Sequence, residues 1–324
     1  MAETLLLTQG DVVALLDAGE LVPRLRAAFV AYAARTVSAQ RHVVPLPASA
    51  PAGANGMVIG PGLIDGIPAF TVKVNTKYPG QTPAIRGVVL LNDLGSGAPL
   101  AVLDAGYLTA LRTGAAMALS AQALARPDAG NLALIGAGVQ GAMGLRALGL
   151  VRTLKRVRVF DSVAGKAQAF CREHRAATGC PVDPAGSVAE AVAGADLVLT
   201  ATWSTRPFLG ADALAPGAHA MTLGADQPGK AELTADAIRR GLFVCDDRAL
   251  AVEMGAVGGV GLDASAIYAE LGEVLTHAKP GRTDPAQVTI FASVGLACQD
   301  LAAAWLVYEK ARKRGVGQRI EFSA

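Results

Sequence analysis

The stretch LALIGAGVQG, residues 132–141, decides the fold because it places a glycine-rich turn directly after an apolar run. The residues that follow, 142–148, have the apolar spacing of a helix. In such a strand–turn–helix unit the first glycine permits a tight turn, the second lets the backbone approach a pyrophosphate, and the third allows close helix–strand packing. The helix N-terminus then offers free amides to the phosphates. The stretch therefore predicts a dinucleotide site, and the expected contacts are Gly136, Gly138, Val139, Gln140 and Gly141.

A second apolar run, 156–160, is followed by Asp161. The distance along the chain from the first glycine to Asp161 is slightly more than the roughly 20 residues that this motif leads us to expect. A carboxylate there would accept hydrogen bonds from the adenosine ribose and repel a 2′-phosphate, which favours NAD (NADH) as cofactor. NADP stays open, because Arg158 or Lys166 could approach the ribose. The glycine motif alone is weak in a glycine-rich chain, and a turn of an unrelated α/β protein is the alternative interpretation.

The chain around this motif alternates between short apolar runs and helical stretches. We expect strands at 132–135, 157–160, 197–200, 218–223 and 242–245, and a helix that begins at Ser187 with Glu190 completing a capping box. Such alternation predicts right-handed crossovers and a doubly wound parallel sheet of the Rossmann type. The end of the third strand then lies on the nicotinamide side of the crevice, so Thr200, Ala201 and Thr202 are expected cofactor contacts.

Residues 1–126 have a different pattern. Thr8 and Asp11 indicate a capped helix start, and a second helix with an apolar face follows at 21–32. Expected strands lie at 57–59, 69–74, 88–91 and 100–103, with a hairpin loop at 92–97, and helices are expected at 105–125 and 296–314. Because the loops are too short for crossover helices, we expect a largely antiparallel sheet. The fold class is thus α/β, with a second α+β domain.

The composition excludes several classes of protein. Of 324 residues, 29 are basic and 27 acidic, so the formal charge of +2 gives no electrostatic reason to expect nucleic acid or an anionic membrane as partner. The four cysteines are scattered, which indicates buried thiols and no metal site. The N-terminus lacks a signal-peptide pattern, and no apolar run reaches the ~20 residues of a membrane span. A cytoplasmic protein is expected.

Three cations lie in apolar or strand-like surroundings: Arg41, Lys73 and Arg112. Burial of a cation is costly unless an anion meets it, and a substrate carboxylate is one such anion. The alternative is that each is a surface or ion-paired residue.

Asp226 follows the expected strand 218–223 and therefore falls at the carboxyl edge of the sheet, where it could exchange a proton with a substrate nitrogen. A loop or helix-capping aspartate is the alternative there. The histidines show no catalytic arrangement, and we interpret them as structural.

The chain resembles the ornithine cyclodeaminase/μ-crystallin family, which includes alanine dehydrogenases and ketimine reductases. The matching stretches, in the family's order and spacing, are residues 70–75 with Pro79, 108–113, 136–141, 224–226, 228–233 and 290–295 with Asp300. The resemblance implies a substrate and dimerisation domain of residues 1–126 with 297–324, around a Rossmann domain of 127–296, and a homodimer formed through the first domain's sheet.

The resemblance also assigns roles to particular residues. It implies that Arg41, Lys73 and Arg112 bind the substrate carboxylate, with Lys73 also near the reacting nitrogen. Asp226 is the implied acid/base, Val294 lines the pocket, and Thr113 joins the cofactor contacts.

Two departures from the cyclodeaminase pattern indicate the substrate. The stretch 55–61 lacks the family's glutamate that meets a distal ammonium, and Ala84 stands where the family has a threonine. Burying an ammonium without a partner is costly. We therefore expect a reductase of small α-imino acids, namely Δ1-pyrroline- or Δ1-piperideine-2-carboxylate. The alternatives are alanine dehydrogenase, then ornithine cyclodeaminase, then a non-catalytic nucleotide-binding protein like the μ-crystallins.

Overall fold

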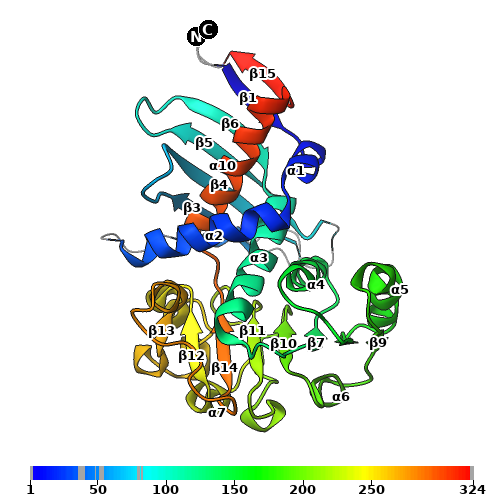
Figure 1. Cartoon of the computed structure of the whole chain (residues 1–324). Coiled ribbons are helices and arrows are strands. Elements are labelled where there is room, and N and C mark those ends of the chain that lie inside the picture. Colours follow the sequence, from blue (N-terminus) through cyan, green and yellow to red (C-terminus); the bar gives the residue numbers. More distant parts are fainter. Residues whose placement is uncertain are drawn as a thin grey trace. The chain divides into compact units, whose positions relative to one another are not determined.

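The computed structural model describes residues 3–35, 41–47, 49–50, 55–78, 81 and 83–321. The chain divides into two compact units (Figure 1). Unit 1 comprises Met1–Arg112 and Leu296–Ala324, and unit 2 comprises Thr113–Gly295. The domain bounds expected from the sequence stay a prediction.

Unit 1 contains a seven-stranded sheet. The strands in spatial order are β15 (Gln318–Glu321), β1 (Glu3–Leu7), β6 (Pro99–Asp104), β5 (Ile85–Asp93), β4 (Ala69–Lys77), β3 (Asn55–Gly62) and β2 (His42–Val44). All neighbours are antiparallel except β1 and β6. The expected antiparallel sheet is confirmed. The hairpin between β5 and β6 is also present, but Asn92 and Asp93 still belong to β5, so the loop is shorter than expected.

Helices cover one face of this sheet. Helix α1 (Gln9–Leu15) begins with the expected capping box of Thr8 and Asp11, and α2 (Ala18–Ala33) buries the expected apolar face. Helix α10 (Ala297–Arg314) packs against α2 and β4 (Figure 1). Along β4 every second residue from Ala69 to Lys77 is buried, as the two-residue period of a strand requires, and these residues include Lys73.

Unit 2 contains an eight-stranded sheet in which all pairings are parallel, which confirms the expected doubly wound fold. The strands in spatial order are β13 (Ala269–Glu270), β12 (Leu242–Cys245), β14 (Thr289–Ala292), β11 (His219–Thr222), β10 (Leu197–Thr200), β7 (Asn131–Ile135), β8 (Arg156–Phe160) and β9 (Val182–Pro184). The chain runs outward from β7 in one direction through β8 and in the other through β10. The carboxyl ends of β7 and β10 therefore flank the switch point where such sheets bind ligands.

The helices of unit 2 connect these strands, except the first, which precedes β7. They are α3 (Gly106–Leu124, which begins in unit 1), α4 (Val139–Val151), α5 (Lys166–Thr178), α6 (Val188–Val192), α7 (Ala235–Arg240), α8 (Arg248–Glu253) and α9 (Leu271–Leu275), with 3-10 turns at Ala211–Ala213, Gly258–Val260 and Ala264–Ala266. Within the described ranges, no helix is both long and apolar enough to cross a membrane.

One local prediction is wrong in part. Ser187 caps α6 by accepting from the Glu190 amide at 3.1 Å, but the Glu190 carboxylate accepts from the Gly186 amide at 2.7 Å. The reciprocal bond of a capping box is therefore replaced by a bond to the preceding residue, which also satisfies a free amide.

Candidate active site

The glycine-rich turn after β7 has the geometry that its three glycines predict. Gly136 has φ of +104°, and a Cβ atom there would collide with the carbonyl group of Ala201. A Cβ at Gly141 would collide with the carbonyl oxygen of Gly136, so the start of α4 packs closely on β7. At Gly138 a Cβ would meet no atom within 4 Å, and this residue caps α4 without a side chain. The amides of the first turn of α4 are thus accessible for a pyrophosphate.

Asp161 is held at this turn by backbone amides. Its carboxylate accepts from the amides of Ala137 at 2.8 Å and Val163 at 2.9 Å, and Lys166 Nζ lies 3.3 Å away. Arg158 is engaged elsewhere, since its guanidinium donates to carbonyl oxygens near α6. Arg158 is therefore bonded to protein carbonyl groups, whereas Lys166, whose side chain is partly exposed, is paired with Asp161 itself.

The loop after β10 is fixed by a residue that sequence reasoning missed, Glu232. Its buried carboxylate accepts from the hydroxyl groups of Thr200 and Thr202, both at 2.7 Å, from the Thr202 amide at 2.9 Å, and from the Gly224 amide at 2.7 Å. Burial raises the pKa of Glu232, and the four donors oppose that rise. Two of the expected cofactor residues are thus bound to one carboxylate.

Asp226 lies in the loop that follows β11. Its Oδ1 atom is 3.0 Å from Nζ of Lys230, and the Asp226 side chain is one-fifth exposed. Lys230 is buried, and its ammonium also lies 4.2 Å from the ring centroid of Trp203. Lys230 was not among the expected site residues.

Val294 follows β14 and is buried. Its amide donates to Asp246 at 2.9 Å, and the Ser293 hydroxyl and the Gly295 amide donate to the same carboxylate at 2.9 and 2.6 Å. Asp246, which the sequence did not single out, therefore holds the segment that carries Val294.

Unit 1 contains a buried ionic cluster in which two of the predicted cations, Lys73 and Arg112, meet one carboxylate. Lys73 Nζ lies 2.6 Å from Oδ2 of Asp300, and Arg112 Nε donates to Oδ1 of Asp300 at 3.0 Å. Arg112 also donates to the amide oxygen of Gln299 at 2.9 Å. All four side chains are buried. Two cations share one carboxylate, so the cluster has an excess positive charge if both are protonated.

The electrostatics of this cluster depend on Lys73. Burial lowers the pKa of Lys73 to about 8, against the attraction of Asp300, and the charges of Arg112 and Arg41 lower it further. The third predicted cation, Arg41, therefore belongs to the same electrostatic environment. The pKa of Asp300 is lowered, because its two cations outweigh the effect of burial.

Polar atoms without hydrogen bonds surround the cluster. Oγ1 of Thr71, Oδ1 of Asn75 and Nε2 of Gln299 are buried and make no hydrogen bond in the described chain. Because unsatisfied buried polar groups are costly, these atoms fit a site that receives a polar ligand. The Oε1 atom of Gln140 in the glycine-rich turn is in the same condition.

Strand β3, one of the two neighbours of β4, carries no acidic side chain. In β3, Gly60 pairs with Lys73 and Val58 pairs with Asn75, and both β3 residues are buried. The surface that β3 presents there is consequently apolar. Pro79, part of the matching pattern, lies outside the described residues.

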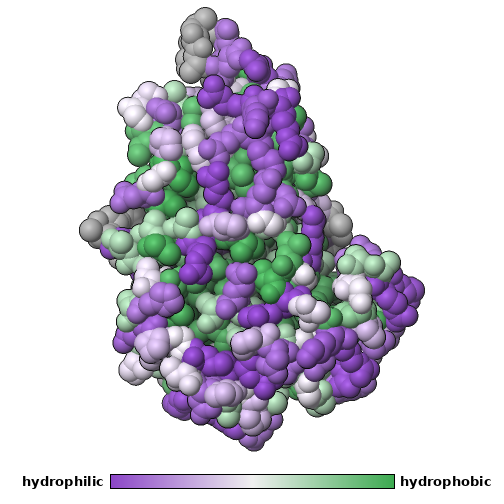
Figure 2. Space-filling model, in the orientation of Figure 1, coloured by the Kyte–Doolittle hydropathy of each residue, from purple (hydrophilic) through white to green (hydrophobic). Residues whose placement is uncertain are grey.

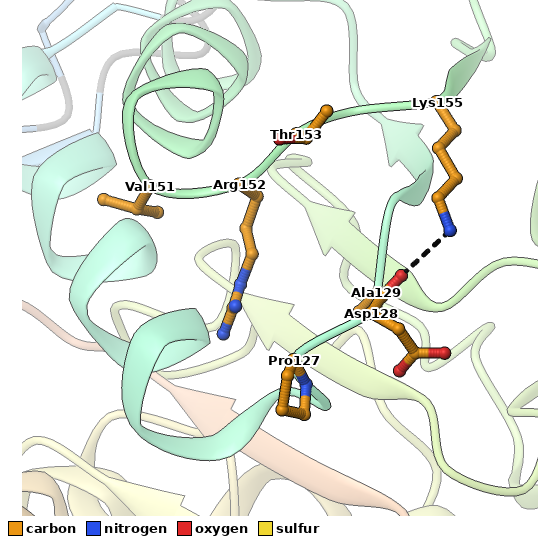
Figure 3. A pocket seen from close by; sticks show the side chains of 7 residues that line it. All are labelled: Pro127, Asp128, Ala129, Val151, Arg152, Thr153 and Lys155. Atoms are coloured by element: carbon orange, nitrogen blue, oxygen red, sulfur yellow. Dashed lines mark hydrogen bonds between the residues drawn. The ribbon is translucent and has the colours of Figure 1, made fainter.

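A hollow in unit 2 contains neither the residues of the glycine-rich turn nor those of the buried ionic cluster. It has a volume of about 280 Å³ and is lined by residues 127–129 and 151–153 with Lys155, whose ammonium donates to the carbonyl oxygen of Asp128 at 3.2 Å (Figure 3). These residues precede β7 and β8, at the amino edge of the sheet. The glycine-rich turn lies at the opposite edge.

His219 illustrates a residue that is structural, as expected. It is fully buried, with Ser120 Oγ at 3.3 Å and Thr289 Oγ1 at 2.9 Å from its ring nitrogens. Burial lowers its pKa to about 3, so the ring is neutral.

Known proteins resemble the chain over nearly its whole length. The model of the ornithine cyclodeaminase/mu-crystallin family matches residues 2–315. A Δ1-pyrroline-2-carboxylate reductase of Bacillus cereus is 35% identical over 307 residues, which are 91% of this chain and 94% of the relative.

Two solved structures have the same fold. The Thermococcus litoralis Δ1-pyrroline-2-carboxylate reductase in complex with NADH and L-proline has a TM-score of 0.91 and 30% identity, and the match covers 98% of this chain and 100% of that one. An archaeal alanine dehydrogenase dimer with bound NAD has a TM-score of 0.89 and 32% identity, with 99% of each chain covered.

Proposed function

The chain belongs to the ornithine cyclodeaminase/mu-crystallin family, and we propose that it is an NADH-dependent reductase of small cyclic α-imino acids, Δ1-pyrroline-2-carboxylate and Δ1-piperideine-2-carboxylate. The observation that carries the proposal is the buried cluster of Lys73, Arg112 and Asp300, next to a strand without an acidic side chain. The cluster supports a carboxylate at one end of the substrate, and the apolar strand supports an apolar ring at the other.

The substrate carboxylate is bound by the excess charge of the cluster. Asp300 neutralises one of its two cations, and the substrate carboxylate neutralises the other. Arg41 adds a further positive charge to the same environment. The substrate's polar groups also supply partners for the buried atoms of Thr71 and Asn75.

The residues of this chain manage the proton in the reaction. Bound NADH would supply a hydride for the C=N carbon, and the nitrogen, which would take the π pair of that bond, would need one proton. Asp226, partly exposed and paired with Lys230, relays this proton, while the Lys73 ammonium polarises the reacting centre.

The second candidate is alanine dehydrogenase, and the likeness to the archaeal dehydrogenase favours it. That reaction uses the same cluster to bind the substrate carboxylate and the same hydride transfer, but it requires free ammonia and a pocket that fits a methyl group. Ornithine cyclodeaminase ranks third, because β3 offers no carboxylate for a distal ammonium. A non-catalytic nucleotide-binding protein has no use for the combination of Lys73 and Asp226.

The test is NADH oxidation by the purified protein, with Δ1-pyrroline-2-carboxylate compared with pyruvate plus ammonia. We expect rapid turnover of the cyclic imine and little or none of pyruvate plus ammonia. Turnover of only the second mixture would make the protein an alanine dehydrogenase. Tight NADH binding without turnover of any imine or keto acid would support the non-catalytic alternative.

We further propose that the protein is a homodimer that associates through the outer face of the unit 1 sheet. Figure 2 shows the opposite, helix-covered face of unit 1, where hydrophilic side chains lie along α10. Val88 and Leu90 of β5 are exposed large apolar residues, and their partners in β4 are Val74 and Val72. An apolar sheet face of this kind is suited to a second copy of the chain.

A further inference from the structure

Glu232 combines strong burial with full hydrogen bonding. Its side chain is 1% exposed, and its carboxylate accepts four hydrogen bonds of 2.7–2.9 Å. Two donors are backbone amides and two are threonine hydroxyls. Burial of an acidic group is costly, and bonds from several donors to the charged form offset that cost.

These four bonds connect two loops at the carboxyl edge of the sheet. Thr200 and Thr202 belong to the end of β10 and the loop after it, whereas Gly224 belongs to the loop after β11 that continues to Asp226. A Cβ atom at Gly224 would collide with the Glu232 carboxylate, so glycine is required for this close approach. One side chain thus sets the spacing of both loops.

The loop of residues 200–202 also contacts the glycine-rich turn. The carbonyl group of Ala201 lies against Gly136, where it leaves no room for a Cβ atom, and the Ala201 amide donates to the carbonyl oxygen of Ile135 at 2.8 Å. Displacement of residues 200–202 would therefore alter the switch point beside β7. Asp161 is held by other hydrogen bonds, which its carboxylate accepts from the amides of Ala137 and Val163.

We propose that Glu232 is a positioning residue for the nicotinamide half of the cofactor, an inference that rests on the proposed function. It fixes the loop 200–202 and the start of the Asp226 loop, whereas Asp161 and the first turn of α4 would hold the adenosine half and the pyrophosphate, and Asp161 has hydrogen bonds of its own. Loss of the Glu232 carboxylate should consequently weaken ligands that carry the nicotinamide and spare those that lack it.

The experiment compares NADH with ADP-ribose, which lacks the nicotinamide, by calorimetric titration of Glu232→Gln. Gln has the same shape, but its amide group places N–H donors opposite the donors of Thr202 or Gly224. We expect the Kd of NADH to rise at least about tenfold, the size of a lost charged hydrogen bond, and that of ADP-ribose to change less than about twofold.

Asp196→Asn provides the matched control. The Asp196 carboxylate accepts from the amides of Gly130 and Asn131 and from Arg126, at the amino edge of the same sheet. This variant should lower the Tm but leave the ratio of the two Kd values unchanged. A merely structural role for Glu232 would give the same pattern as Asp196.

Equal weakening of both ligands by Glu232→Gln, or no effect on either, overturns the inference. If that variant does not fold, Thr202→Val removes one donor and should shift the ratio in the same direction by a smaller factor; an unchanged ratio there also overturns it. Because no imine enters these titrations, a failure of the proposed reaction in the wild type leaves this result interpretable on its own.

Discussion

Lys73 is the residue whose ionisation should control substrate binding near neutral pH. Its pKa is lowered to about 8. Below that pH the ammonium is charged and attracts a carboxylate; above it the charge is lost. A bound carboxylate raises the pKa, so affinity should be constant below about pH 8 and fall by up to about tenfold per pH unit above it. The measurement is the inhibition constant of pyrrole-2-carboxylate, whose charge is constant in this range.

Lys73→Arg is the control for this pH dependence, because a guanidinium stays charged throughout. Its inhibition constant should be nearly independent of pH, even if it is higher overall. A wild-type inhibition constant that does not change between pH 7 and 9.5 would show that the charge of Lys73 is not used to bind the substrate.

Asp226→Asn should reduce kcat by about 10²–10⁴-fold, because the amide keeps the shape but cannot relay a proton. NADH binding should be unaffected. Asp212→Asn is the matched control, since this aspartate is fully exposed in the same unit and should leave both quantities unchanged. Unchanged turnover in the Asp226 variant would remove this residue from the mechanism.

The sequence identifies some of these residues and misses others for a physical reason. A cation within an apolar strand or helix is itself a signal, which is why the sequence predicts Lys73 and Arg112 as site residues. Glu232 gives no such signal, because it stands in a loop and its partners Thr200 and Gly224 lie 32 and 8 residues away. Only the fold brings a carboxylate and its donors together.

Among the elements, α10 depends on its ion pairs with β4 and α3. Asp300→Asn would leave Lys73 and Arg112 buried without a counter-ion. Removing one partner of a buried pair costs about 3–5 kcal/mol, so the free energy of unfolding should fall by roughly that amount. Urea unfolding followed by circular dichroism measures the change.

Glu309→Gln on the same helix is the control. Glu309 pairs with Arg24 of α2 at 3.1 Å, and both side chains are more than two-fifths exposed, so the loss should stay below about 1 kcal/mol. If the two variants lose equal stability, the buried cluster does not stabilise the docking of α10.

The elements also divide into those that local sequence determines and those that pairing determines. The α1 start is set by Thr8 and Asp11, three residues apart, and was predicted. Strand β13 has two residues and β9 has three, too few for an apolar period, and both exist through pairing with a neighbouring strand. Such strands cannot be read from their own residues.

For the whole molecule, the apolar outer face of the unit 1 sheet predicts the oligomeric state. Val88→Lys with Leu90→Lys places two charges on that face, where burial against a second copy would desolvate them, so we expect a dimer to become a monomer of about half the mass. Light scattering after size exclusion measures this. Val13→Lys with Val30→Lys, on exposed positions of α1 and α2, is the control and should stay dimeric. A wild-type monomer, or a double variant of β5 that stays dimeric, would contradict association through this face.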